Sequence, residues 1–584
     1  MFKTLEIEIL NLFRDSCFEF RILKRLSRIS FLVLITFISS IPNAQAAMGR
    51  KAMVATADPN ATRVALEVLN RGGNAVDAAV AAQWVLNVVE PASSGIGGGG
   101  FFLYYEAETK RVYAFDGRET APSEAFPEMF LDAEGNPLPF KPQAITGGLP
   151  VGVPGTLKLL STVHSRFGSK AFSFRDLLSP AIYIAENGFP ISDRLAYHIA
   201  QEKERLKLFE ASKKFFLDKK GEPLPAGAIL FQPDLAKTFK LIQKDGIHPF
   251  YEGEIAEAIV KAVRNAPYHP GYMKKDDLFY YKIIERNPVQ GSYRGYDILS
   301  MSPPSSGGTT LIETLQILER YKLSVHGRNA DALHLFAEAQ KLAFLDRNKY
   351  LADPDFNKVP VDQLLSKEFA MKRSEEIQFQ YAIPTETAVR PLVLEPTHTS
   401  HISVVDEQGN MVAYTTTIED IFGSALMVPG YGFFLNNELT DFDMVPRDPA
   451  DKLVANAPAG DKRPRSSMTP VFIFKDGKPF LIAGSPGGSK IIGTVLNVIV
   501  NLIDFGMSLE DAMAAPRIIN RAGLTELEQP LYDDPALRRE LWRRGHPIVL
   551  SPPLGNVQAI HFDQEAEMIY GESDPRAEGE ALGY

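Results

Sequence analysis

The chain has 584 residues, a length that corresponds to about four domains at roughly 150 residues each. Its composition, with 45% hydrophobic, 10% aromatic and 23% charged residues and a single cysteine, is that of a folded globular protein and excludes disordered, collagen-like and disulfide-rich classes. The formal net charge of −10 disfavours nucleic acid and anionic membranes as partners, because both bind through basic surfaces. We therefore expect a small molecule or a peptide as substrate.

The N-terminal segment has the pattern of a secretory signal. A basic cluster over 24–28 precedes an apolar run over 29–41, and Ala-Gln-Ala at 44–46 follows as a cleavage pattern. A single membrane anchor is the alternative, but the apolar run is shorter than the roughly 20 residues that span a bilayer. We expect residues 1–46 to be a signal peptide, and the mature protein to be exported, periplasmic or secreted, without a membrane partner.

Loss of this signal changes the charge and the thiol content of the protein. The mature chain would keep 56 basic and 68 acidic residues, a net charge of −12, and would lose Cys17, the single cysteine. Disulfides, thiolate metal sites and cysteine catalysis are then excluded.

The start of the mature chain is predicted to contain two helices, a glycine-rich segment and then two short strands. Asn60 is the expected N-cap of a first helix, and an alanine-rich apolar stretch over 76–89 predicts a buried second helix. A glycine cluster over 95–100 then leads into two short β-patterns, at 101–105 and 111–115.

The middle of the chain and the region after Thr399 differ in predicted secondary structure. Residues 150–380 are predicted to be mainly helical, with a loop-like Pro, Ser and Gly stretch over 301–308. From Thr399 onward, apolar and polar residues alternate over 401–405 and 411–417, which predicts a β-hairpin.

The C-terminal part continues with the same sheet-rich pattern. Two strands are predicted at 471–474 and 479–483, and a helix at about 490–502. No internal repeat of fixed period is present. The sequence therefore predicts a sheet-rich second part and a largely helical first part that adds a few strands of its own.

Common catalytic patterns are absent from the sequence. The ten histidines form no HExxH motif, and His398 and His401 lie at a strand start, so no metal site is expected. The glycine run 97–100 lacks the lysine of a phosphate-binding loop and precedes a strand, which disfavours a nucleotide cofactor. Ser93 and Ser94 fit neither GxSxG nor SxxK, so serine-hydrolase chemistry is not expected.

Thr399 is the remaining candidate for chemistry. It heads a hydrophobic strand, where threonine is most often simply a β-former. If the chain were cut before Thr399, however, this residue would carry both its hydroxyl and a free α-amine. An α-amine with a pKa of about 7.7–8.0 can act as general base for the hydroxyl near neutral pH. Taken alone, these residues leave both interpretations open.

Ten motifs in a fixed order make the sequence resemble the γ-glutamyltransferase (glutathione hydrolase) family of N-terminal-nucleophile hydrolases, from about residue 48 to residue 584. They are GGNAVDAA at 72–79, SSGIGGG at 93–99, DGRE at 116–119, PPSSGG at 303–308, DPDF at 353–356, TSHISVVD at 399–406, NNELTDF at 436–442, RPRSSM at 463–468, GSPGG at 484–488 and DPR at 574–576. One such motif is weak, but the ordered set favours the nucleophile interpretation of Thr399.

The resemblance implies an α+β fold of the N-terminal-nucleophile type, a four-layer αββα sandwich built jointly by two autoprocessed subunits. A precursor would cut itself between His398 and Thr399. The products would be a large, mainly helical subunit, 47–398, which contributes strands to the shared sheets, and a small, sheet-rich catalytic subunit, 399–584, with Thr399 at its new N-terminus. No cofactor and no metal is implied.

The resemblance also implies the reaction. Thr399 Oγ would attack the γ-amide of glutathione or a related compound, and the γ-glutamyl ester would pass to water or to an amino acid or peptide amine. Thr417 would orient Thr399, and the backbone N–H groups of Gly487 and Gly488 would form the oxyanion hole.

Substrate recognition requires opposite charges, because a γ-glutamyl group carries an α-carboxylate and an α-ammonium. Arg118, Ser466 and Ser467 match the carboxylate-binding positions of the family. Asp441, with Glu438, matches its ammonium-binding positions. Outside these motifs, a lone Arg or Asp is usually a structural or solvated ion-pair residue.

Two departures from the family pattern bear on specificity. Glu419 stands where many members have asparagine, and it either strengthens ammonium binding or repels the α-carboxylate. The segment 446–462, where many relatives carry an aromatic lid, is shorter and has no aromatic residue, which predicts a more open pocket. The alternatives are an acylase of the same fold that acts on glutaryl or other side-chain amides, as a cephalosporin acylase does, and a non-catalytic exported binding protein.

Overall fold

The structure is a computed structural model that describes residues 46–384 and 398–584. The predicted signal segment, apart from its last residue, and Cys17 lie outside the described residues. In the described part of the chain, no helix is long and apolar enough to cross a lipid bilayer.

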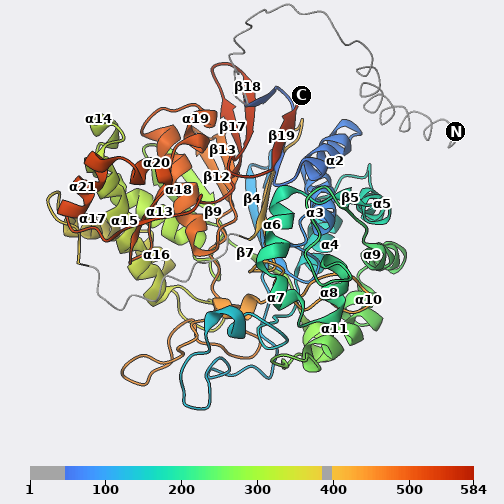
Figure 1. Cartoon of the computed structure of the whole chain (residues 1–584). Helices are drawn as coiled ribbons and strands as arrows, with labels where there is room; N and C mark the ends of the chain where they lie inside the picture. The colour runs from blue at the N-terminus through green and yellow to red at the C-terminus, as the bar shows by residue number, and fades with distance from the viewer. Residues whose placement is uncertain (1–45, 385–397) are drawn as a thin grey trace, which may run out of the picture. The chain divides into compact units, whose positions relative to one another are not determined.

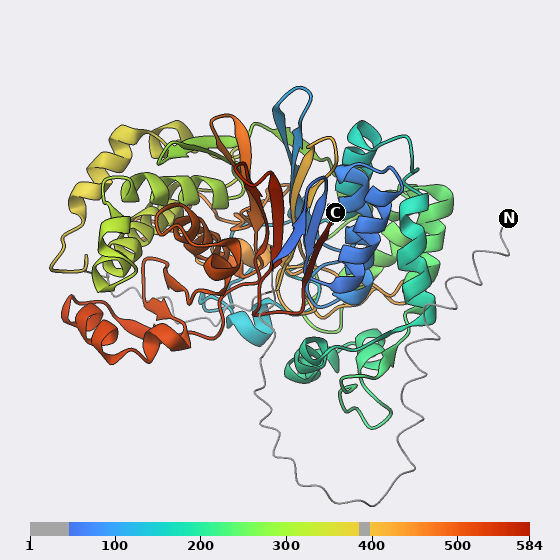
Figure 2. The ribbon, with the colours of Figure 1, turned by 90° about the horizontal axis from the view of Figure 1, so that it is seen from above.

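Two seven-stranded antiparallel sheets pack face to face at the centre (Figure 2). The first sheet has the order β1 (Ala47–Gly49), β18 (Met568–Ser573), β17 (Gln558–Asp563), β13 (Lys478–Gly484), β12 (Val471–Lys475), β9 (Tyr296–Ser300), β8 (Val289–Tyr293). The second has the order β19 (Glu580–Gly583), β2 (Met53–Thr56), β10 (Ser400–Val405), β11 (Met411–Thr417), β3 (Gly99–Glu106), β4 (Arg111–Gly117), β7 (Ile284–Arg286). Both sheets therefore combine strands from before and after Thr399.

Helices cover the outer face of each sheet (Figures 1 and 2). The second sheet is covered by α2 (Pro59–Asn70), α3 (Ala75–Val89) and α4 (Thr156–Phe167). On the first sheet lie α13 (Gly307–Leu318) and α18 (Ile491–Ile503), with α15 (Ala330–Tyr350) packed on α13. Every residue of α3 is buried, as expected for a helix that is apolar on all sides. The predicted αββα sandwich is confirmed.

Further α-helices and two small sheets accompany the sandwich. The other α-helices are α5 (Ser179–Asn187), α6 (Asp193–Gln201), α7 (Lys203–Leu206), α8 (Glu210–Phe216), α9 (Pro233–Asp245), α10 (His248–Tyr251), α11 (Glu254–Arg264), α12 (Lys275–Tyr280), α14 (Leu323–His326), α16 (Val361–Leu364), α17 (Lys367–Glu376), α19 (Leu509–Ala514), α20 (Gln529–Tyr532) and α21 (Pro535–Arg543). Two small sheets contain β14 (Ile518–Asn520), β15 (Thr525–Leu527) and β16 (Ile548–Leu550), and β5 (Phe189–Pro190) and β6 (Ile229–Leu230).

The predicted hairpin after Thr399 is present in the middle of the second sheet. Strands β10 and β11 pair antiparallel, with Ser400 opposite Thr416 and Val405 opposite Met411. Because β10 begins at the same end of the sheet where β11 finishes, Thr399 and Thr417 are brought side by side. Strand β2 on one side of this hairpin and β3 on the other hold both ends in register.

One sequence prediction about local structure is wrong. Asp58, and not Asn60, is the N-cap of α2, since its carboxylate accepts the Asn60 N–H at 2.7 Å. The middle region is mainly helical, as predicted, and it contributes β7, β8 and β9 to the central sheets, strands of only three to five residues whose side chains are partly exposed. Such short strands give little alternation in the sequence, and their pairing fixes them: β7 pairs with β4, β9 with β12, and β8 with β9.

Candidate active site

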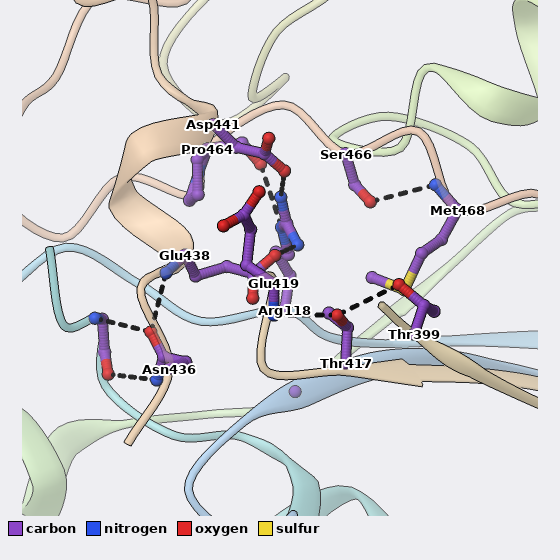
Figure 3. Close-up of polar contacts among 12 residues, drawn as sticks. Arg118, Thr399, Thr417, Glu419, Asn436, Glu438, Asp441, Pro464, Ser466 and Met468 are labelled. Carbon is purple, nitrogen blue, oxygen red and sulfur yellow. Dashed lines mark hydrogen bonds and ion pairs between the residues drawn. The ribbon is translucent and has the colours of Figure 1, made fainter. Parts of the chain in front are cut away.

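Two threonine hydroxyls contact the backbone carbonyl oxygen of His398, in the peptide bond that precedes Thr399. Thr399 is buried at 4% exposure, and its Oγ1 donates to the His398 carbonyl oxygen at 2.6 Å. Thr417 Oγ1 lies 3.2 Å from that carbonyl oxygen and 3.2 Å from Thr399 Oγ1. Figure 3 shows the contact between the two threonine side chains. The Glu419 backbone N–H donates to Thr417 Oγ1 at 2.8 Å, which fixes the second hydroxyl. The hydroxyl of Thr399 is thus held within reach of the carbonyl that precedes it.

The nearby histidines are neutral core residues. The His401 ring contacts the hydroxyls of Thr415 and Ser403 at 2.8 and 3.1 Å, and burial lowers its pKa to about 3. The His398 ring packs edge-on against His198, with centroids 4.4 Å apart, and burial lowers the pKa of His398 well below its usual value. Among the described residues, no group of three or more His, Cys, Asp and Glu side chains is arranged to hold a metal ion.

A charged cluster lies beside the threonines and centres on Arg118 (Figure 3). Arg118 follows the end of β4 and is almost fully buried. Its guanidinium bonds to the carboxylates of Glu438 and Asp441, which stand on the short 3-10 helix η5 (Glu438–Asp441). The structure therefore brings together one cation and two acids that are more than 300 residues apart in the sequence.

Glu419 links the threonine pair to this cluster. Its backbone φ is +78°, a left-handed conformation that residues with a branched or long side chain rarely adopt. Besides the backbone bond to Thr417, its carboxylate accepts from the Asn437 side-chain amide. In Figure 3 the Glu419 side chain rises from the threonine level toward Arg118 and Asp441. Strain of this kind persists where surrounding contacts hold it, often at functional sites.

Glu119, next to Arg118 in the chain, has a protonated and therefore uncharged carboxyl group. Burial raises its pKa to about 8, so the carboxyl group carries a proton at neutral pH. Neither of its side-chain oxygens has a hydrogen-bond partner within the described residues. Glu119 therefore adds no charge to the cluster at pH 7.

Ser466 and Ser467 are fixed from two other segments of the chain. Ser306 donates its backbone N–H and its hydroxyl to the Ser466 carbonyl oxygen, at 2.7 and 2.6 Å. Arg347, on α15, donates to Ser467 Oγ at 2.7 Å and to Ser306 Oγ at 2.8 Å. The guanidinium of Arg347 thus holds Ser467 directly and Ser466 through Ser306.

Gly487 ends the turn that follows β13 and is the N-cap of the short 3-10 helix η6 (Gly488–Lys490), whose first residue is Gly488. Their φ angles are +139° and +54°, and a side chain at either position would be strained. At the end of β13, a Cβ on Gly484 would lie 2.2 Å from the His401 ring, so this strand end touches the start of β10. The glycine turn therefore follows directly from a strand end that packs beside the threonines.

Sequence reasoning missed several residues that build the site. Asn436 accepts the backbone N–H groups of Gly152 and Glu438 at 2.9 and 3.1 Å, and donates to the Gly97 and Gly152 carbonyls, which anchors η5 (Figure 3). Asn437, Ser306 and Arg347 hold Glu419 and the serine pair. The first three stand inside the quoted motifs, but Arg347 lies outside them all and carried no signal.

Comparison with known proteins places the chain in a family. A family model described as Gamma-glutamyltranspeptidase matches residues 61–584, which include all ten motifs. The chain belongs to this family. The chain is 41% identical over 560 residues to the glutathione hydrolase proenzyme of Bacillus subtilis (strain 168), and the alignment covers 92% of each chain.

Acylases are also among the similar proteins. The chain is 36% identical over 539 residues to the Acylase ACY 1 proenzyme of Pseudomonas sp. (strain SE83). This alignment covers 91% of this chain and 93% of that protein. The crystal structure of cephalosporin acylase from Bacillus halodurans superposes with a TM-score of 0.82 at 29% identity, and covers 95% of this chain and 99% of that one. The resemblance that the motifs predicted is confirmed, together with the fold.

Proposed function

We propose that this protein cleaves the γ-glutamyl amide bond of glutathione and related compounds, and passes the acyl group to water or to an amino acid or peptide amine. The observation that carries this proposal is the buried Thr399 hydroxyl, 2.6 Å from the preceding carbonyl oxygen and beside a cluster of one guanidinium and several carboxylates. The similarity to glutathione hydrolase proenzymes supports it.

The first step of the proposal is self-cleavage. Thr399 Oγ attacks the His398 carbonyl carbon, the C–N bond breaks, and the nitrogen of Thr399 takes up a proton as the new α-amine. Water then hydrolyses the resulting ester, which leaves a carboxylate on His398 and restores the Thr399 hydroxyl. A hydrogen bond from Thr417 to the carbonyl oxygen, now 3.2 Å long, would stabilise the negative charge that develops there.

The second step uses the same hydroxyl on a substrate. The free α-amine of Thr399, with a pKa of about 7.7–8.0, accepts the hydroxyl proton and delivers it to the leaving amine. The γ-glutamyl ester that forms is resolved by water or by an acceptor amine. Backbone N–H groups of Gly487 and Gly488 are proposed as the oxyanion hole for both half-reactions.

Recognition of the donor would use the charged cluster and the serine pair. Arg118, Ser466 and Ser467 are proposed to bind the α-carboxylate, and Glu438 and Asp441 the α-ammonium. The arrangement offers both charges within one site, in which Arg118 and Glu438 are buried and Asp441 is partly exposed, and a zwitterionic α-amino acid group requires both charges. The loop 446–462, without aromatic residues, would leave this pocket open to acceptors.

The proposal includes export and two subunits. Residues 1–46 would be removed on export to the periplasm or the medium. Self-cleavage would then give a large subunit, 47–398, and a small subunit, 399–584, which stay together because both central sheets contain strands from each.

An acylase of glutaryl or other side-chain amides is the second candidate. Its support is the similarity to acylases. A non-catalytic binding protein of the same fold would neither mature nor turn over substrate.

The test compares γ-glutamyl and glutaryl p-nitroanilides on the purified, mature protein. The proposal predicts release of p-nitroaniline from the γ-glutamyl compound and stimulation of that release by a dipeptide acceptor. Thr399→Ala should abolish both maturation and turnover, whereas Thr399→Ser should retain part of each. Cleavage of the glutaryl compound alone would favour the acylase, and turnover by Thr399→Ala would refute the nucleophile.

A further inference from the structure

The peptide bond proposed for self-cleavage is held differently on its two sides. On the downstream side, Thr399 leads directly into β10, whose pairing with β11 begins with Ser400 opposite Thr416. On the upstream side, His398 precedes this pairing, and its carbonyl oxygen is contacted by the two threonine hydroxyls. Because a peptide unit is rigid, the direction of that carbonyl also depends on how His398 itself is held.

The imidazole ring of His398 is held by a second ring. It packs edge-on against the ring of His198 on α6, with centroids 4.4 Å apart and ring planes at 87°. Both side chains are buried. An edge-to-face arrangement at this distance is a preferred geometry of aromatic pairs. The pair therefore ties the residue before the scissile bond to a helix of the large subunit.

Both rings are uncharged at neutral pH. Burial, with Arg194 nearby, lowers the pKa of His198 to about 3. Burial, with His198, Arg194 and Lys141 nearby, lowers the pKa of His398 well below its usual value. Nδ1 of His398 has no hydrogen-bond partner among the described residues. The contact between the rings therefore depends on their shape and packing, and not on a charge.

Helix α6 is anchored to the segment that follows Thr417. Arg205, on the next helix α7, donates to the carbonyl oxygens of Ile421 and Gly423 at 3.2 and 2.6 Å. The same guanidinium donates to the carboxylate of Glu202, the C-cap of α6, at 2.8 Å. One frame thus holds the histidine ring of α6 and the chain just beyond Thr417. The scissile carbonyl and the second threonine are fixed relative to each other through this frame.

We propose that His198 is a positioning residue for self-cleavage, which acts through the ring of His398 and keeps the His398 carbonyl in the orientation that the Thr399 hydroxyl attacks. This inference rests on the proposed function and extends it to a residue outside all ten motifs. Holding two reacting groups in near-attack geometry lowers the barrier without a further chemical group. Since His398 becomes the end of the large subunit after cleavage, the contact acts on maturation and not on turnover.

The experiment follows loss of the uncut chain on denaturing gels after cell-free synthesis of the full-length protein. His198→Ala removes one ring and should slow cleavage before Thr399 by about 3- to 10-fold, within the range to which an edge-to-face ring pair corresponds. His198→Phe keeps a flat ring of similar size and should cleave within twofold of the wild-type rate.

A double variant shows whether His198 acts through His398. His398→Ala removes the partner ring and should slow cleavage to a similar extent. Adding His198→Ala to it should change the rate by less than a further twofold, because the contact is already lost. His248→Ala, at an exposed position on α10, is the matched control and should cleave at the wild-type rate.

Turnover by the matured protein separates positioning from a general structural role. Once His198→Ala has been cut completely, its kcat and KM for the γ-glutamyl p-nitroanilide should lie within twofold of the wild-type values. A parallel fall in kcat would indicate a general loss of structure and would overturn the inference.

Three other results would also overturn it. These are cleavage of His198→Ala within twofold of the wild-type rate, additive effects of the two alanine substitutions, and cleavage of His198→Phe as slow as that of His198→Ala, which would assign the effect to a ring nitrogen. Failure of the proposed function looks different, because the wild-type chain would then stay uncut or leave the γ-glutamyl compound uncleaved.

Discussion

Replacing Thr417 by valine removes one hydroxyl and almost nothing else, since the two side chains have nearly the same shape. In the structure that hydroxyl contacts the His398 carbonyl oxygen and Thr399 Oγ1, both at 3.2 Å, and accepts the Glu419 N–H at 2.8 Å. We expect Thr417→Val to fold and to slow self-cleavage, because the carbonyl oxygen loses a donor at the moment it becomes an oxyanion.

The size of the effect follows from these contacts. A hydrogen bond to a charged group contributes about 1.5–3 kcal/mol, and at about 1.4 kcal/mol per factor of ten this slows cleavage roughly 10- to 150-fold. The Glu419 N–H, which loses its acceptor, costs about 1 kcal/mol of folding stability. That loss is too small to unfold a domain of this size.

The assay follows disappearance of the uncut chain on denaturing gels after synthesis in a cell-free system. Thr417→Ser keeps a hydroxyl and is the matched control, so it should cleave within a few-fold of the wild-type rate. If Thr417→Val cleaves within twofold of wild type while remaining folded, the hydroxyl does not stabilise the reaction, and the reasoning from its contacts is refuted.

Three further predictions concern residues around the cluster. Glu119 has a folded-state pKa of about 8 against a usual value of 4.5, so the stability contributed by its proton is lost as the pH rises through that interval. Between about pH 5 and pH 8.5, Glu119→Gln should therefore lose less stability than the wild-type protein, by up to roughly 4 kcal/mol in urea titrations. Identical losses would contradict the burial argument. Arg347→Lys cannot keep both bonds to Ser306 and Ser467, and we expect KM for the γ-glutamyl anilide to rise about tenfold with little change in kcat, a split that a purely structural role would not produce. Gly487→Ala meets no atom closer than 3.6 Å but must adopt φ near +139°, so kcat should fall at least tenfold at unchanged KM, and full activity would show that this turn is not an oxyanion hole.

Local sequence patterns predicted the elements that carry the site, but not their partners. Alternation over 401–417 was enough to predict the hairpin β10–β11, and uniform apolarity was enough for α3. The strands that pair with this hairpin could not be predicted from the sequence. Strand β2 pairs with β10 across about 350 residues and has only four residues of its own. Strand pairing at such separations is decided by tertiary packing, which also explains why β7–β9 were missed.

In the candidate site too, long-range contacts could not be predicted from local sequence patterns. Thr399 by itself looked like an ordinary strand residue, and only the resemblance carried by ten ordered motifs gave it a chemical role. The structure adds what no motif contains, namely that Arg118 is bonded to both Glu438 and Asp441, and that Arg347 holds Ser467. These links join residues 120 to 323 positions apart, so their energetic coupling has no local signature in the sequence.

The proposed function depends on cleavage of the peptide bond between His398 and Thr399 by the hydroxyl of Thr399. This cleavage can be tested by N-terminal sequencing of the purified wild-type protein after separation on a denaturing gel. We predict two chains, the smaller beginning Thr-Ser-His-Ile-Ser, and a single uncut chain for Thr399→Ala. A wild-type protein that stays in one piece, a smaller chain that begins at another residue, or a Thr399→Ala variant that still yields the two chains would contradict it.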